Sequence, residues 1–277
     1  MRFERIKIYP NNRSGGVEGI SVLRCSNCGL VRLSETVDDP DKFYAEGNMY
    51  DGGTPPIEVL RRESFEDDRR RYLFMRPMIV NKSVLDFGCG DGGFLKFAKE
   101  SADIADGVEL NEVNRKALND EGLNIYKSID EAGSYDVITL FHVLEHLPNP
   151  VEMLQLFAGH LKKNGQIIIE VPNADDALLS LYGSEAFADF TYWICHIYLY
   201  NTQTLKMLVA KAGLKINFVK QIQRYPLANH LYWLSKNLPG GHAKWAFMAD
   251  DKELNERYAA CLSNLGMADT ILMSVSV

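Results

Sequence analysis

The sequence has few cysteines, no long apolar run and no excess of positive charge. Its five cysteines are an odd number and are widely scattered apart from one pair, so they do not form a disulfide framework, and we expect free thiols in a reducing compartment. No apolar run approaches the ~20 residues of a membrane-spanning helix, and the start, MRFERIKIYP, has charges where a signal peptide is apolar. These absences predict a soluble, cytoplasmic protein.

Charge and composition exclude further classes of protein. The 30 Lys and Arg residues against 37 Asp and Glu residues give a formal charge of -7, which is the wrong sign for holding a nucleic acid backbone. Hydrophobic residues make up 46% of the chain and charged residues 24%, as in ordinary globular proteins and unlike disordered or collagen-like chains. At ~150 residues per domain, the length predicts two domains, or one domain with large appendages.

Two regions differ in pattern. Residues 1–80 are predicted to form an N-terminal appendage with a β-like start, a Cys-x-x-Cys turn and a charged helix over 60–72, whose alternating signs we interpret as a solvated face. Residues 81–277 alternate short β runs with amphipathic helical segments, which is typical of a parallel sheet with crossover helices. An aromatic insertion within this region, at about 225–268, is predicted to be helical. The predicted strands are SVLDF, DGVEL, LNIYK, YDVITLF, GQIIIEVP, LKINFVKQI and TILMSVSV.

A glycine-rich turn follows the first of these strands. Glycines let the backbone turn sharply and let a ligand approach the start of the next helix. Glu109 ends the second strand, 21 residues after Gly88, which is the spacing for binding ribose hydroxyls. Gly88, Gly90 and Gly93 also satisfy the G-x-G-x-x-G pattern of nicotinamide dinucleotide sites. Asp86 argues against a dinucleotide, because a carboxylate there would repel a pyrophosphate, whereas it could accept hydrogen bonds from an ammonium group or the loop.

Four motifs occur in order and resemble those of the class I S-adenosylmethionine-dependent methyltransferases. They are VLDFGCGDGGFL, VEL, YDVITLFHVLEHLPNP and LKKNGQIIIEVPN, and TILMSVSV is similar to the last antiparallel strand of that family. The resemblance implies a Rossmann-like α/β fold with a seven-stranded, mostly parallel sheet and helices on both faces. It also implies methyl transfer from S-adenosylmethionine, with S-adenosylhomocysteine as the product.

The resemblance also implies the roles of individual residues. The glycine turn and its neighbours would bind the methionine part of the cofactor, Glu109 the ribose, and an apolar pair the adenine, while the end of the fourth strand would lie under the cofactor. The implied cofactor-binding residues are Asp86, Gly88, Cys89, Gly90, Asp91, Glu109, Leu110, Ile129, Phe141, His142 and Val143, with Tyr50 covering the methionine end.

Three histidines are candidates for the base that removes a proton from the acceptor. A positioned base typically contributes ~10²- to 10⁴-fold, and His is the usual choice near neutral pH. His142 and His146 lie four residues apart, which could suggest metal ligands, although bracing of the loop is the stronger interpretation of His146. His196 is the preferred candidate, because HIYLYNTQTL resembles a segment of sugar-modifying relatives in which an equivalent histidine faces the acceptor.

The predicted acceptor is a hydroxyl or carbon of a sugar or glycan precursor. This rests on the His196 segment and on RCSNCGLVRL, which resembles one knuckle of an N-terminal zinc ribbon. Residues 1–24 contain no Cys or His, so the ribbon is incomplete and a zinc ion held by Cys25 and Cys28 would need a second copy of the chain. The alternative acceptor is a quinone, polyketide or lipid-like molecule. Less favoured are a nicotinamide-dependent oxidoreductase and a non-catalytic cofactor-binding module.

Two further expectations concern metals and the insertion. Adjacent acids at Asp175 and Asp176 could bind a divalent ion, but acids that open a helix are more often caps, so we predict metal-independent transfer. The insertion is predicted to form a lid or cap over the acceptor. It is preferred over a membrane-surface helix because only Lys236 and Lys244 lie near its apolar residues. The sequence does not predict an oligomeric state.

Overall fold

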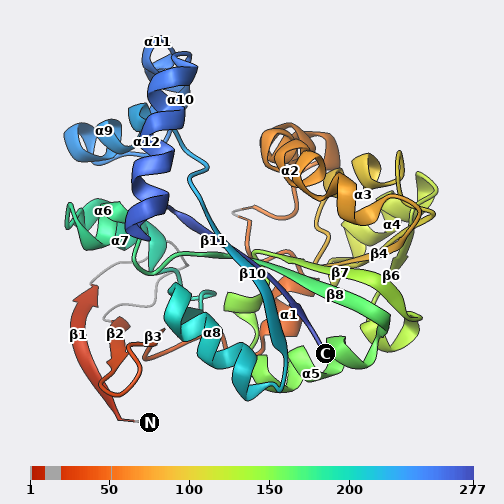
Figure 1. Cartoon of the computed structure of the whole chain (residues 1–277). Coiled ribbons are helices and arrows are strands. Elements are labelled where there is room, and N and C mark those ends of the chain that lie inside the picture. Colours follow the sequence, from red (N-terminus) through yellow and green to blue (C-terminus); the bar gives the residue numbers. More distant parts are fainter. Residues whose placement is uncertain (1, 10–19, 51) are drawn as a thin grey trace. The chain divides into compact units, whose positions relative to one another are not determined.

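The structure, a computed structural model, describes residues 2–9, 20–50 and 52–277 (Figure 1). Part of the predicted N-terminal appendage, at positions 1, 10–19 and 51, therefore lies outside the described residues. The chain divides into two compact units. Unit 1 consists of residues 1–37, 170–208 and 218–273, and unit 2 of residues 38–169, 209–217 and 274–277. The predicted domain boundary near residue 80 stays a prediction.

A seven-stranded sheet of order β10-β11-β8-β7-β4-β5-β6 confirms the predicted α/β fold. Strand β4 (Ser83–Phe87) pairs in parallel with β5 (Ile104–Val108) and β7 (Tyr135–Phe141), and β5 pairs in parallel with β6 (Asn124–Tyr126). The other strands are β8 (Leu161–Pro172), β10 (Lys215–Ile222) and β11 (Thr270–Ser276). Three of the boundaries between the two units fall inside these last three strands, one in each.

Helices cover both faces of the sheet in unit 2. Figure 1 shows α2 (Ile57–Ile79), α3 (Gly93–Ala98) and α4 (Glu112–Asp120) on one face and α5 (Pro150–Gly159) on the other. Shorter elements are α1 (Pro40–Ala45) and the 3₁₀ turns η1 (Ile129–Glu131) and η2 (Leu144–His146). Helix α8 (Thr202–Lys211) crosses the boundary between the units.

The core of unit 2 follows from strands that are covered on both sides. Such strands are apolar without alternation, and in β4 and β7 nearly every side chain is buried. The inner faces of the helices supply the rest of the core, and Phe87 of β4 packs edge-on against Phe157 of α5 at 4.8 Å between ring centroids. This rigid base fixes the positions of the loops that follow β4, β5 and β7.

Unit 1 contains a second, four-stranded antiparallel sheet. It is formed by β1 (Phe3–Tyr9), β2 (Ile20–Cys25), β3 (Val31–Leu33) and β9 (Tyr198–Leu199), in that order. The predicted β-like start of the chain is therefore a strand. Strand β9 pairs with β3 at Leu199↔Val31 and Tyr198↔Arg32, which places the predicted His196 segment beside the N-terminal sheet.

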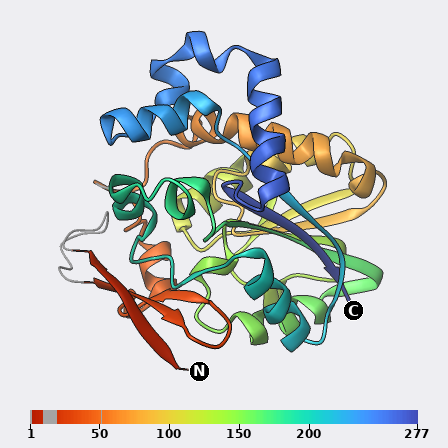
Figure 2. The ribbon, with the colours of Figure 1, turned by 60° about the vertical axis from the view of Figure 1, so that its left-hand side comes forward.

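The remaining helices of unit 1 include the predicted insertion. They are α6 (Ala177–Ser180), α7 (Glu185–Thr191), α9 (Leu227–Lys236), α10 (Gly241–Lys244), α11 (Ala246–Ala249) and α12 (Lys252–Leu265). Helices α9 to α11, which we call the cap, lie at the end of unit 1 opposite to the β1–β3 sheet (Figures 1 and 2). The helical prediction for this insertion is confirmed.

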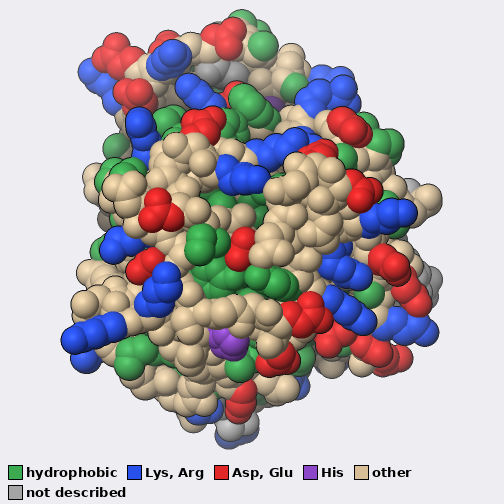
Figure 3. All heavy atoms as spheres, turned by 90° about the vertical axis from the view of Figure 1, so that its right-hand side faces the viewer, with side chains coloured by type: hydrophobic (Ala, Val, Ile, Leu, Met, Phe, Trp, Pro, Cys, Tyr) green, Lys and Arg blue, Asp and Glu red, His purple; other side chains and the backbone are tan. Residues whose placement is uncertain are grey.

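Two whole-chain observations bear on partners. On the face shown in Figure 3, Lys and Arg side chains are interspersed with Asp and Glu side chains, and neither sign forms a continuous patch. No helix among the described residues is long and apolar enough to cross a membrane.

Candidate active site

The turn after β4 has the backbone conformation that its glycines predict. Gly88, Gly90 and Gly92 have φ angles of 75°, 55° and 70°, a region that strains residues with a β-carbon. A β-carbon at Gly88 would collide with Val143, whereas one at Gly90 would meet nothing within 4 Å. The turn therefore packs tightly against the loop after β7 and leaves open space above Gly90.

Glu109 joins the end of β5 to this turn. Its Oε2 accepts a hydrogen bond from the Gly90 amide at 2.8 Å, and its Oε1 accepts one from the Asn111 amide at 2.7 Å. Burial raises the pKa of this carboxyl, and the two amide donors oppose that rise. Each carboxylate oxygen keeps a further acceptor position, so Glu109 can still accept hydrogen bonds from a pair of hydroxyl groups.

Two further carboxyl groups flank the turn. Asp86, at 4% exposure, accepts a 2.6 Å hydrogen bond from the Thr139 hydroxyl, and its burial raises its pKa to about 7. Asp91 accepts from the Gly93 amide at 2.8 Å and from the Ser64 hydroxyl at 2.9 Å, and burial raises its pKa as well. The partner of Asp86 is thus a side chain on β7 and not the glycine turn.

Helix α2 contributes a polar stripe that the sequence interpretation missed. Arg61 donates to the Asp91 carbonyl at 2.9 Å, and Ser64 reaches the Asp91 carboxylate. One turn further on, Asp68 pairs with Arg71 at 3.1 Å. Residues 61, 64, 68 and 71 recur at helical spacing, so this face of the charged helix packs on the glycine turn instead of facing only solvent. The solvated-face interpretation of the helix was therefore wrong for these residues.

Arg71 is a cation close to three of these acids. Its guanidinium lies 4.6 Å from the centroid of the Phe141 ring, and its charge opposes the rise in the pKa of Asp68, Asp86 and Asp91. Burial nevertheless raises the pKa of Asp68 to about 6. A ligand that brings a positive charge of its own would stabilise the ionised form of these buried acids.

The predicted apolar and aromatic site residues also lie in unit 2. Phe141 is buried at the end of β7 and packs edge-on against Phe94 at 5.0 Å. Ile129 is buried in η1, and the Leu110 carbonyl accepts a hydrogen bond from Arg115. Cys89 is buried, and its burial raises the pKa of its thiol, so this thiol is unreactive.

Tyr50 lies close to the acids of the site. Burial, together with the negative charges of Glu109, Asp91 and Glu63, raises the pKa of the Tyr50 phenol to about 12. The phenol is therefore neutral at physiological pH and can donate a hydrogen bond.

The loop after β7 holds two of the three candidate histidines around a buried acid. Glu145 is 1% exposed, and its Oε1 lies 3.4 Å from His142 Nδ1 and 3.8 Å from His146 Nε2. The other ring nitrogen of His146 hydrogen bonds to the Tyr44 hydroxyl at 2.9 Å. His142 has a φ of 55°, a conformation that is uncommon for a residue with a β-carbon and recurs at functional sites.

His196 belongs to unit 1. Its Nδ1 lies 3.0 Å from the Thr191 carbonyl, and its ring packs edge-on against Trp193 at 5.5 Å between centroids. A hydrogen bond to the carbonyl fixes Nδ1 as the protonated nitrogen in the neutral ring, so Nε2 is the atom that can accept a proton.

Cys25, Cys28 and Asp176 are the remaining residues that the sequence analysis considered as metal ligands. Cys25 is the last residue of β2 and Cys28 lies in the turn that follows, and both are free thiols. Among the described residues, neither belongs to a group of three Cys, His, Asp or Glu residues close enough to share an ion. Asp176 caps α6, accepting a hydrogen bond from the Leu178 amide at 2.7 Å, which confirms the cap interpretation of this acid.

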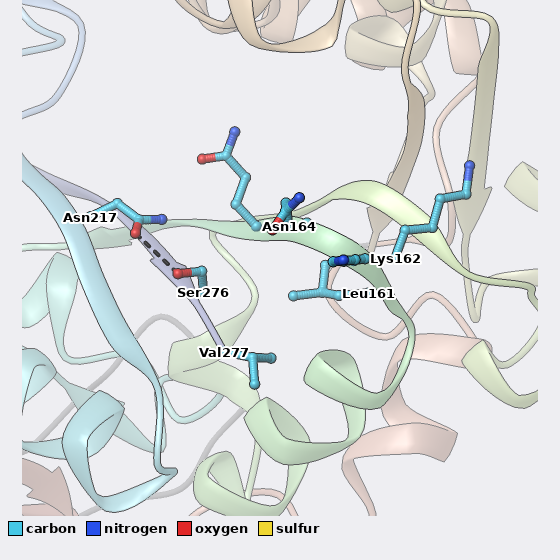
Figure 4. Close-up of a pocket in the computed structure, with 9 residues that line it drawn as sticks. Leu161, Lys162, Asn164, Asn217, Ser276 and Val277 are labelled. Carbon is cyan, nitrogen blue, oxygen red and sulfur yellow. Dashed lines mark hydrogen bonds between the residues drawn. The ribbon is translucent and has the colours of Figure 1, made fainter.

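A separate hollow of about 640 Å³ lies in unit 2 at the start of β8 (Figure 4). Its lining is mostly polar, and Ser276 donates a 3.1 Å hydrogen bond to Asn217 across it. None of the predicted site residues lines this hollow.

Comparisons with known proteins bear on the chemistry of the glycine turn. The model of a family described as "Methyltransferase domain" matches residues 60–217. The ubiquinone biosynthesis O-methyltransferase of Acinetobacter baylyi is 28% identical over 179 residues, which cover 58% of this chain and 74% of that protein. The protein of the same name from Burkholderia pseudomallei is 30% identical over 195 residues, 63% of this chain and 82% of that protein.

One solved structure adds a likeness of fold. It is a chain from the complex between the Haloferax volcanii Trm112 methyltransferase activator and a protein described as a methyltransferase. It is 16% identical, has a TM-score of 0.53, and the match covers 87% of this chain and 98% of that one.

Proposed function

The chain belongs to the S-adenosylmethionine-dependent methyltransferases, and from this premise we propose that it methylates a hydroxyl oxygen of a quinone-like or lipid-like small molecule. The observation that carries the acceptor class is the similarity to the Burkholderia pseudomallei relative, which spans 82% of that protein and is named for ubiquinone biosynthesis. The nicotinamide alternative has no counterpart among the relatives reported above.

We propose that unit 2 binds the nucleoside part of the cofactor through Glu109 and the glycine turn. The open space above Gly90 fits a ligand that lies against the backbone, and Glu109 has acceptor positions left for the ribose hydroxyls. Leu110 and Ile129 are proposed to flank the adenine. Cys89 and Val143 are proposed to contribute backbone and packing surface rather than reactive groups.

The amino-acid end of the cofactor is proposed to lie between Asp86, Asp91 and Arg71. An amino-acid group carries an ammonium and a carboxylate, which match the acids and the guanidinium respectively. Arg71 rests on the Phe141 ring and on Asp68, so its fork is oriented before a ligand arrives. Tyr50, as a neutral phenol beside these acids, is proposed to cover this end.

When bound, the cofactor supplies a methyl group on a positively charged sulfur, which is displaced by the acceptor oxygen. The chain's own residues must orient that oxygen and remove its proton. His196, His146 and His142 remain the candidate bases. Orientation alone can supply ~7 to 11 kcal/mol of the barrier, and a positioned base contributes ~10²- to 10⁴-fold.

The sugar or glycan acceptor, and with it a role in glycan biosynthesis, is not supported by the curated relatives reported above, which are named for ubiquinone biosynthesis. The incomplete zinc ribbon also adds no support for a sugar acceptor. Transfer is proposed to be independent of metal, which fits the capping role of Asp176, and chelation with EDTA should leave the rate unchanged.

The proposal is tested by methyl transfer from labelled S-adenosylmethionine to a prenylated catechol, a hydroquinone and a set of nucleotide sugars. We expect label in the catechol or hydroquinone and none in the sugars. Label in a sugar alone would overturn the acceptor class, and binding of S-adenosylhomocysteine with no transfer to any acceptor would point to a non-catalytic module.

A further inference from the structure

The turn between β2 and β3 brings two thiols close together. The Gly29 amide donates to the Cys25 carbonyl, and the Cys25 amide donates to the Leu30 carbonyl, both at 2.9 Å. A hydrogen bond from residue i+4 back to residue i closes one turn of helix, so Cys25 and Cys28 lie on the same side of this turn. Side chains three residues apart in a helical turn have β-carbons ~5 to 6 Å apart, and a disulfide needs ~3.5 to 4.5 Å. A small movement is therefore enough to join the two sulfurs.

The two cysteines differ in how firmly they are held. Cys25 is 1% exposed and pairs with Phe3 of β1 in the antiparallel sheet. Cys28 is half-buried, and it precedes Gly29, which has a φ of 80° and open space where a β-carbon would stand. Closing the pair therefore moves Cys28 toward Cys25, and solvent reaches Cys28 first.

The surroundings of Cys25 favour its thiolate. The pKa of the Cys25 thiol is lowered, chiefly by the backbone amides of Cys28 and Asn27 and also by the neighbouring Cys28 thiol, while burial opposes this change. The thiolate is the form of cysteine that attacks a disulfide. Cys89 differs in this respect, because burial raises the pKa of its thiol. Cys25 is thus a buried nucleophile that stands beside a more accessible thiol.

A metal ion is the other common ligand of a Cys-x-x-Cys pair. A structural zinc ion takes four ligands. In the described parts of the chain, no third Cys, His, Asp or Glu lies close enough to share an ion with these two thiols. One copy of the chain therefore supplies half of a zinc site, whereas it supplies both partners of a disulfide.

We propose that Cys25 and Cys28 form a reversible disulfide by exchange with a low-molecular-weight disulfide. The Cys28 thiolate attacks one sulfur of the small disulfide, which forms a mixed disulfide and releases a first small thiolate. The Cys25 thiolate then attacks the Cys28 sulfur, which closes the protein disulfide and releases a second small thiolate. The two protein thiols lose two electrons and two protons, the small disulfide gains the electrons, and its two thiolates take up the protons. Excess small thiol reverses both steps. The proposal does not depend on the proposed function.

The test is mass spectrometry of the full-length protein after incubation with mixtures of reduced and oxidised glutathione and alkylation of the remaining thiols. In the oxidised mixture, we expect the peptide with Cys25 and Cys28 to lose two hydrogen atoms and to escape alkylation. Excess reduced glutathione should restore both thiols. Cys25→Ser should keep glutathione on Cys28, because the thiolate that displaces it is absent. Cys28→Ser should leave Cys25 without glutathione, because the Cys25 thiol is buried.

Cys261 of α12 is the control within the same molecule. It is exposed, so it should take up glutathione without forming an internal disulfide. Cys261→Ser is the matched control variant and should form the Cys25–Cys28 disulfide as the parent does. Circular dichroism equal to that of the parent shows that each variant is folded.

The proposal is overturned if Cys25 and Cys28 are still alkylated under conditions that modify Cys261. It is also overturned if excess reduced glutathione does not restore the two thiols, or if Cys25→Ser carries no glutathione on Cys28. Zinc bound by a dimer that EDTA dissociates, and lost in Cys25→Ser and Cys28→Ser, would overturn it in favour of a metal site shared by two copies of the chain.

Discussion

Glu109 connects two loops that the proposed cofactor must contact together. Its carboxylate ties the Gly90 amide to the end of β5 while keeping acceptor positions for a ligand. We predict that Glu109→Gln weakens the binding of S-adenosylhomocysteine about tenfold to a hundredfold, because hydrogen bonds to a charged group contribute ~1.5 to 3 kcal/mol. Calorimetric titration measures this. Affinity equal to that of the parent would remove Glu109 from the ribose site.

Arg71 gives a prediction that separates the two ends of the ligand. Arg71→Met should weaken the binding of S-adenosylhomocysteine about tenfold or more, because the carboxylate of this ligand loses its guanidinium partner. It should leave 5′-methylthioadenosine unchanged, since that ligand lacks the amino-acid group. Competition titrations with both ligands measure the difference.

Arg69→Met is the matched control for Arg71, since Arg69 lies on the same helix, its side chain is 55% exposed and it pairs with Glu66 at 3.9 Å. An equal loss for both ligands in Arg71→Met would show a general disturbance of the site and contradict the assignment to the carboxylate.

At the scale of elements, helix α2 marks the limit of what the sequence predicts. Gly88, Gly90 and Glu109 could be identified because a glycine turn and an acid at fixed spacing occur within one short stretch. Arg61, Ser64 and Asp68 could not, because nearly every turn of this helix is charged and the stripe that faces the site is set by packing on α3. The signal that could have found them is the small Ser64 between Arg61 and Asp68 at helical spacing.

The strands also include some that the sequence predicts and one that it does not. Strands β4 and β7 coincide with the predicted runs because both are buried on two sides and apolar throughout. Strand β9 was not predicted as a separate element, because two residues are too short for any periodicity to show. Its pairing with β3 joins the first and second segments of unit 1, and no local pattern encodes a contact between segments so distant in the sequence.

The histidines give a prediction about the elements that carry them. His196→Ala should slow turnover by ~10²- to 10⁴-fold with little change in the affinity for S-adenosylhomocysteine, because its Nε2 is the nitrogen left to accept a proton. Single-turnover rates with each of His196→Ala, His146→Ala and His142→Ala identify the base. Full activity of His196→Ala would exclude it, and a loss in His142→Ala or His146→Ala would transfer the role to the loop after β7.

The whole molecule should lose stability as the pH rises. Asp176 has its pKa raised to about 8 by burial and by Asp269, and Asp68 and Asp86 have theirs raised to about 6 and about 7. A carboxyl whose folded pKa is raised binds its proton more tightly in the folded state. Its contribution is therefore full below the ordinary pKa of 3.8 and is lost as the pH rises toward the folded value. The free energy of unfolding should fall between about pH 5 and pH 8.

Denaturant unfolding at pH 5.5 and about pH 8 measures this trend. Asp176→Asn keeps the acceptor for the Leu178 amide but cannot ionise, so its stability should depend less on pH than that of the parent. Glu121, whose pKa its partners Arg61 and Lys96 lower to about 2, stays ionised across this range and adds no slope. Stability that rises from pH 5.5 to pH 8 would contradict the account.

The identity of the cofactor is the claim on which the predictions for Glu109, Arg71 and the histidines depend. The most direct test is a calorimetric titration of the purified chain with S-adenosylhomocysteine, and with NAD in a parallel cell. Saturable binding of S-adenosylhomocysteine alone is the predicted result. Binding of NAD alone, or of neither ligand to the folded chain, would contradict the proposed roles of Asp86, Glu109 and Arg71 and, with them, the proposed function.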